Sequence, residues 1–337
     1  MRNTNIEILR FLLMMLILIQ HILIWGENFV YVGSSSFQIP PNYYYKLFLL
    51  SFSSFAVGCF MLMSGFFGIK FKYSTLLNFI FQAFVYALLG YCVQVNCCNG
   101  KFFDFKSILV VLFPISSSNR WFLTGYVFIM ILSPLINKGL EFLSKRNFFI
   151  LLAIMYYYTC IGPEFYGSFY NGSGYLMFLY LLGRYLNQYN IIEKINKSKS
   201  ILLFVSGNLF CFLLILFAHV VGKSQLSFFR ICAYGNPWVI CMAIGIFSYV
   251  LKLRPLKKES VNTILKHTFA IYLITESLGK ILYEKLVHIL NSNILLFFVL
   301  IVIIGFTCMV IDYLLLRLYS PLRNAIIIKL RLNESKI

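Results

Sequence analysis

Arg10 and His21 are ionisable residues that stand at the two ends of one apolar run, Phe11 to Gln20. On an α-helix, eleven steps of about 100° make roughly three turns, so both side chains share one face, about 16 Å apart along the axis. In a hydrocarbon core about 30 Å thick such groups are costly, and they usually serve binding or catalysis. Because imidazole ionises near neutral pH, His21 is suited to take a proton from a hydroxyl group. Alternatively, Arg10 reaches the membrane surface and His21 only makes a packing contact.

Carboxylates are scarce in the apolar stretches of this chain. Glu7 precedes Arg10 by three residues, which is the spacing of an ion pair on one helix face and also of an acid favoured by a helix N-terminus. Glu276 lies in the apolar segment 268–283, where a carboxylate needs a partner. It could orient His21, bind the hydroxyl group of an acceptor, or form a structural salt bridge.

The remaining candidate acids and bases are few. Asp312 lies in the last apolar stretch and is expected to pair with Arg317 or with another base on the same side of the membrane. Of the other histidines, His219 is expected at a depth similar to that of His21 and is the second candidate base. His267 and His288 are expected near opposite membrane surfaces.

A cation and two aromatic residues gather at the start of another apolar stretch. Arg120, Trp121 and Tyr126 are expected near the outer end of a helix that spans 119–138. An arginine and an indole at this depth are typical of an interfacial anchor. The same side chains could form the rim of a sugar-binding cleft, which makes them candidate substrate-binding residues.

The elements that must position these residues are membrane helices, because ten apolar stretches of about 20 residues occur along the chain. With the N-terminus inside, twenty Lys and Arg residues fall in inner segments and eight in outer ones, which favours cytoplasmic termini. The predicted fold is therefore an all-α bundle of about ten transmembrane helices, forming one domain over 1–337. The predicted spans are 6–26, 44–68, 74–95, 119–138, 147–163, 173–188, 200–222, 234–251, 264–283 and 294–318.

The composition supports this class. Hydrophobic residues make up 60% of the chain and the mean hydropathy is +0.82, values typical of a membrane bundle. The net charge is +18, but the basic residues stand in short runs between apolar segments, as in membrane loops. No nucleic-acid motif and no metal-ligand spacing is present among the residues, so we expect neither nucleic acid nor a metal as a partner.

Several of these segments, taken in order, resemble the acyltransferase 3 family of polytopic membrane O-acyltransferases. The matching segments are NIEILR at 5–10 followed by His21, FMLMSGFF at 60–67, RWFL at 120–123 with Tyr126 and Pro134, Asn236-Pro237, and TFAIYLI at 268–274. The resemblance implies about ten helices, an acyl-coenzyme A donor on the cytoplasmic side, and transfer of the acyl group to a carbohydrate hydroxyl. It also implies that His21 is the catalytic base and that Arg10 is either a cation on the donor side or a structural cation.

The chain departs from the family pattern in two places. Many members have a histidine after the segment at 268–274, where this chain has Thr275 and then Glu276. Many members also carry two arginines after the second helix, where Lys70 and Lys72 are the nearest bases. Lysine lacks the bidentate fork of arginine, so the role of these two lysines in binding donor phosphates is an expectation only.

The sequence thus predicts a bacterial multi-pass protein of the plasma (inner) membrane that transfers an acyl group, in the first instance acetyl. The expected donor is acetyl-coenzyme A and the expected acceptor a cell-surface glycan or its lipid-linked oligosaccharide precursor. In this interpretation His21, Arg10 and Glu276 are catalytic, and Arg10, Lys70 and Lys72 bind the donor. The alternative is a transporter or flippase that moves a lipid-linked glycan past the same polar residues, without using the acyl donor.

Overall fold

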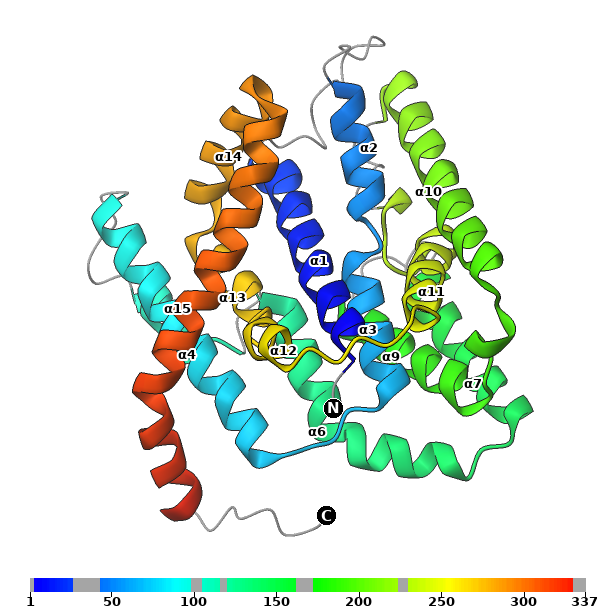
Figure 1. Cartoon of the computed structure of the whole chain (residues 1–337), viewed down its shortest axis with the longest axis horizontal. Coiled ribbons are helices and arrows are strands. Elements are labelled where there is room, and N and C mark those ends of the chain that lie inside the picture. The colour runs from blue at the N-terminus through cyan, green and yellow to red at the C-terminus, as the bar shows by residue number, and fades with distance from the viewer. Residues whose placement is uncertain are drawn as a thin grey trace.

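The structure is a computed structural model that describes residues 3–26, 43–97, 105–115, 120–161, 172–223 and 230–329. Within these ranges the chain forms helices and no strand (Figure 1). The prediction of an all-α protein is therefore confirmed for the part of the chain that the structure describes.

The helices follow one another in the order expected from the apolar stretches. They are α1 (Thr4–His21), π-helical η1 (Ile22–Gly26), α2 (Tyr44–Ser53), α3 (Ala56–Phe67), α4 (Tyr73–Cys97), α5 (Phe105–Leu112), α6 (Trp121–Glu141), α7 (Lys145–Tyr156), π-helical η5 (Tyr157–Ile161), α9 (Gly172–Gln188), 3₁₀-helical η6 (Ile192–Lys194), α10 (Lys197–Val220), α11 (Pro237–Leu251), α12 (Glu259–Leu265), α13 (Phe269–Leu278), α14 (Lys280–Ser292) and α15 (Ile294–Lys329).

Six helices in the described ranges are long and apolar enough to cross a membrane. They are Thr4–Gly26, Tyr44–Phe67, Tyr73–Asn96, Trp121–Glu141, Lys197–Val220 and Ile294–Lys329. The other four predicted spans coincide with shorter helices: α7 with η5, α9, α11, and the series from α12 to α14. Residues 162 and 163 of the fifth predicted span lie outside the described ranges. The multi-pass class is therefore supported, whereas the number of ten spans remains a prediction.

The two ends of the described chain lie at the same end of the bundle. In Figure 1 the start of α1 and the end of α15 are both in the lower part of the molecule. This arrangement agrees with termini on one side of the membrane. Which side is cytoplasmic remains a prediction, because it depends on loop charges and not on the arrangement of helices.

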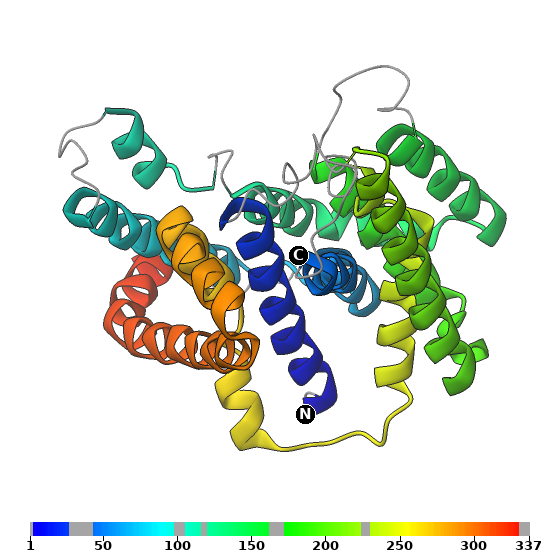
Figure 2. The same ribbon diagram turned by 90° about the horizontal axis from the view of Figure 1, so that it is seen from above.

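Helix α1 lies in the middle of the bundle and positions the candidate base. It contacts α2, α3, α11, α12, α13 and α15 (Figure 2). Its residue Leu13 is completely buried, and Met14 and Leu18 are 1% exposed. The start of the helix is fixed by the chain before α12, since Thr4 N–H donates to the Leu256 carbonyl. Most residues of α1 are therefore buried against neighbouring helices, whereas Ile8 and Leu12 are exposed.

Helices α3 and α9 approach each other through two glycines. A Cβ atom at Gly65 would stand 2.1 Å from the Tyr180 carbonyl oxygen, and one at Gly183 would stand 2.2 Å from that of Leu62. Small residues allow helix backbones to approach closely in membranes, where packing drives association. The close approach of α3 and α9 thus explains why residue 65, within the segment 60–67, is a glycine.

Replacing Gly65 by Ala is expected to destabilise the protein by about 1–3 kcal/mol or more, because the backbones must separate to admit the methyl group. Gly139→Ala is the matched control, because a Cβ at Gly139 meets no atom within 4 Å. Thermal unfolding of the purified protein in detergent would measure the difference. Equal melting temperatures for the two variants would contradict the packing role of Gly65.

The predicted span 264–283 is divided into three helices, which differs from the single helix expected. The backbone turns between α13 and α14 at Gly279, whose φ of 53° is readily adopted by glycine. Helix α14 then packs against η1, where a Cβ at Gly26 would meet the Tyr283 carbonyl oxygen at 2.7 Å. This turn brings the end of α13 and the first turn of α14 to the end of α1.

Candidate active site

The candidate base His21 is the last residue of α1, where the α-helix passes into the π-helical turn η1. π-Helical turns are rare and often occur at functional sites. The side chain of His21 is 16% exposed, so it is largely enclosed by protein rather than directed into lipid. The side chains around it come from α13 and α14.

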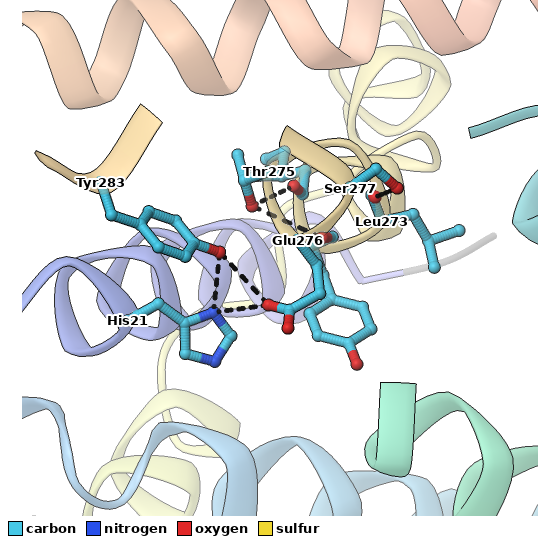
Figure 3. Close-up of polar contacts among 8 residues, drawn as sticks. His21, Leu273, Thr275, Glu276, Ser277 and Tyr283 are labelled. Atoms are coloured by element: carbon cyan, nitrogen blue, oxygen red, sulfur yellow. Dashed lines mark hydrogen bonds and ion pairs between the residues drawn. The ribbon is translucent and has the colours of Figure 1, made fainter. Parts of the chain in front are cut away.

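His21, Glu276 and Tyr283 form one polar cluster (Figure 3). Nδ1 of His21 lies 3.2 Å from Oε2 of Glu276. The Tyr283 hydroxyl donates to the same carboxylate oxygen at 3.2 Å and lies 3.4 Å from Nδ1. The rings of Tyr283 and Tyr272 lie 5.9 and 6.4 Å from the imidazole, centroid to centroid. The contact places Glu276 against His21, which is the geometry required both by a carboxylate that orients the base and by a structural salt bridge.

The second ring nitrogen of His21 is available for chemistry. Nε2 points away from Glu276 and Tyr283 in Figure 3 and has no hydrogen-bond partner in the described ranges. A carboxylate that accepts from Nδ1–H holds the tautomer in which Nε2 is unprotonated, and it stabilises the imidazolium formed when Nε2 takes a proton. This arrangement can carry out general base catalysis on a hydroxyl group.

Arg120 lies beside this cluster, as the residue before α6. It is 5% exposed, and its Nη2 donates to the Ser277 hydroxyl at 2.7 Å. Its Nε and Nη1 atoms are buried and have no hydrogen-bond partner in the described part of the chain. Arg120, Glu276 and Ser277 line a cavity of about 220 Å³. Buried N–H donors without partners are costly, so they are well suited to receive a polar or anionic ligand group.

Arg10 pairs with Glu7, as the spacing predicts, through a 2.8 Å contact between Nη1 and Oε1. A series of ring contacts leads from Tyr126 to the candidate base: Tyr126 stacks on Phe122, Phe122 contacts Tyr272, and Tyr272 contacts His21. These ring contacts connect α6 and α13 with His21.

The remaining predicted site residues lie elsewhere. Trp121 stacks on Tyr234 at 5.7 Å and packs on Gly172. Lys70 and Lys72 are exposed in the link between α3 and α4. The structure thus joins Arg120 to the polar cluster, and it leaves Trp121 and the two lysines outside that cluster.

Two members of the site were not identified from the sequence. Tyr283 follows Glu276 by seven residues, two helical turns, but the turn at Gly279 means that helical periodicity does not place it. Ser277 is an ordinary residue in an apolar stretch, and only its contact with Arg120 singles it out. His219, the second candidate base, is buried on α10, apart from the residues described above.

A bundle of apolar helices that encloses a histidine–carboxylate pair is compatible with a polytopic membrane enzyme that uses acid–base catalysis. The family model described as an acyltransferase domain, that of the acyltransferase 3 family, matches residues 3–313. The chain therefore belongs to the acyltransferase 3 family, as its motifs suggest. No curated protein and no solved structure matches the chain.

Proposed function

We propose that the protein is a membrane O-acyltransferase that transfers an acyl group, in the first instance acetyl, from cytoplasmic acyl-coenzyme A to a hydroxyl of a glycan. The proposed acceptor is a cell-surface glycan or its lipid-linked precursor, and the proposed location is the bacterial plasma membrane. The observation that carries the proposal is the oriented imidazole of His21, with one nitrogen on Glu276 and the other unoccupied. Family membership supports acyl transfer as the reaction.

In the proposed mechanism, Nε2 of His21 removes the proton from the acceptor hydroxyl while the oxygen attacks the thioester carbonyl. The carbon–sulfur bond then breaks, the acyl ester forms, and coenzyme A leaves with the proton returned from the imidazolium. Glu276 stabilises that imidazolium through Nδ1. The free N–H groups of Arg120 are the proposed donors to the carbonyl oxygen as it gains negative charge.

Membranes containing the protein, incubated with acetyl-coenzyme A labelled in the acetyl group and with the glycan fraction of the host, are expected to yield a labelled, alkali-labile ester on the glycan. Membranes without the protein are the control. A transporter would move the glycan but would incorporate no label. Translocation of the lipid-linked glycan without any dependence on the acyl donor would therefore favour the transporter over the enzyme.

A further inference from the structure

Tyr272, in helix α13, carries a hydroxyl that the contacts of the site leave unexplained. The residue is 6% exposed, and its phenol oxygen is buried without a hydrogen-bond partner in the described ranges. The backbone N–H of Leu123, in the first turn of α6, lies toward this oxygen but outside hydrogen-bond geometry. Because an N–H can only donate, the O–H proton of Tyr272 has no acceptor among the described residues.

Other tyrosine hydroxyls that are enclosed in the bundle have acceptors. Examples of such donor and acceptor pairs are Tyr86 with Asp312, Tyr180 with Asn137, and Tyr283 with Glu276. Asp312 also pairs with Nδ1 of His267, at 2.6 Å, and not with Arg317, which contacts Tyr313. Burying a hydroxyl without an acceptor destabilises a folded chain. This cost singles out Tyr272 as a donor that is available to a bound molecule.

Tyr272 lies beside the reacting groups of the proposed mechanism. Its ring is 6.4 Å from that of His21 and 5.9 Å from that of Phe122, centroid to centroid. Glu276 follows Tyr272 by four residues and so shares its face of α13, yet this carboxylate accepts from Tyr283. The Tyr272 ring is therefore held between the candidate base on α1 and the first turn of α6.

The start of α6 supplies further donors. Arg120 is the residue before the helix, and its Nε and Nη1 atoms have no partner in the described part of the chain. The first N–H groups of an α-helix also lack partners within the helix, and they carry partial positive charge. Together with the Tyr272 hydroxyl, these groups form a surface of hydrogen-bond donors near His21. Donors that are fixed in this way stabilise an oxygen that gains negative charge in a transition state.

We propose that the Tyr272 hydroxyl is a further catalytic group, which donates a hydrogen bond to the thioester carbonyl oxygen as that oxygen gains negative charge. The hydroxyl acts alongside Arg120 and gives up no proton, since the proton of the acceptor hydroxyl passes through His21. The inference rests on the proposed function, because it adds a donor to that reaction. It also gives the tyrosine of the 268–274 segment a role in chemistry rather than in packing.

Tyr272→Phe tests the proposal, because it removes the hydroxyl and keeps the ring that contacts His21 and Phe122. In the transfer assay on membranes, normalised to inserted protein, kcat is expected to fall by about 10²-fold. This is the usual loss when one donor to an oxyanion is removed. The KM values for the acyl donor and the acceptor should change little, because the hydrogen bond strengthens only in the transition state.

Tyr319→Phe is the matched control. Tyr319 is 9% exposed, and its hydroxyl also lacks a partner in the described ranges. Its ring stacks on that of Phe81 at 5.9 Å, which joins α15 to α4 and involves none of the site residues. The substitution therefore makes the same chemical change at a similar burial, and its kcat should equal that of the unmodified protein.

Thermal unfolding in detergent separates catalysis from packing. Both substitutions remove a buried O–H that has no acceptor, so neither variant should melt at a lower temperature than the unmodified protein. Loss of transfer by Tyr272→Phe at an equal or higher melting temperature would support the catalytic role. A loss of transfer accompanied by a clear fall in melting temperature would make the hydroxyl structural and overturn the proposal.

The kinetic constants separate the remaining outcomes. A Tyr272→Phe variant with unchanged kcat and a raised acceptor KM would show that the hydroxyl binds the acceptor, which also overturns the proposal. Unchanged kcat and KM would refute the role of Tyr272 and leave the proposed function standing. Absence of acyl transfer by the unmodified protein would instead refute the proposed function, and the inference with it.

Discussion

His21→Ala is expected to lower the rate of acyl transfer by about 10²- to 10⁴-fold, the usual contribution of a positioned general base. The substitution removes Nε2 and also leaves Glu276 with Tyr283 as its remaining partner in the cluster. Because His21 stands at the end of α1, where alanine is a good helix former, the variant should still fold and insert. The measurement is the labelled-acetyl assay on membranes, normalised to the amount of inserted protein.

His288→Ala is the matched control, because this histidine is exposed on α14, the same helix that carries Tyr283. Its transfer rate should equal that of the unmodified protein. A His21→Ala variant that transfers acetyl groups at the normal rate would remove the imidazole from the mechanism. An equal loss in both variants would mean that the damage lies in folding and not in chemistry.

The sequence predicted the part of the site that lies on one helix. Arg10 and His21 are eleven residues apart in a single apolar run, and helical geometry alone places them on one face. The ion pair of Arg10 with Glu7 follows from the same local rule, and it is present at 2.8 Å. The pairing of Glu276 with His21 was one of three alternatives, since no local rule joins residues that are 255 positions apart.

The parts that were not predicted depend on breaks in helices and on contacts between them. The 264–283 stretch has the length and apolarity of one span, but the turn at Gly279 places Tyr283 beside His21 instead of two turns above Glu276. Likewise, Asp312 and His267 are neighbours only because α12 and α13 lie against α15. Hydropathy describes the length of an apolar stretch, and it contains no information about which distant polar groups will compensate each other.

Family resemblance filled part of this gap and also misplaced some residues. It directed attention to His21 and to the segment that begins at Arg120, both of which contribute to the polar site. Many family members have a histidine after the segment 268–274, and this chain does not. At this place the structure has the Glu276 carboxylate, which lies against His21. A carboxylate at this position can orient the base, so the departure from the family pattern is compatible with activity.

Glu276→Gln is the second substitution expected to have a large effect, lowering kcat by about 10²-fold or more. The amide is close in size to the carboxylate but is neutral, so it neither stabilises the imidazolium nor holds a single tautomer of His21. In serine proteases, loss of the corresponding carboxylate beside the catalytic histidine lowers kcat by about 10⁴-fold. Tyr283→Phe removes one hydrogen bond and should cost about tenfold or less.

The comparison of kcat with KM distinguishes the two roles considered for Glu276. A residue that positions His21 acts on the chemical step, so Glu276→Gln should lower kcat while the KM values for donor and acceptor change little. A carboxylate that binds the acceptor hydroxyl would instead raise the acceptor KM with kcat nearly unchanged. Glu276→Asp keeps the charge but shortens the side chain by one methylene, so it should retain more activity than Glu276→Gln. The reverse order of activities would show that the size of the side chain, rather than its charge, is what His21 requires.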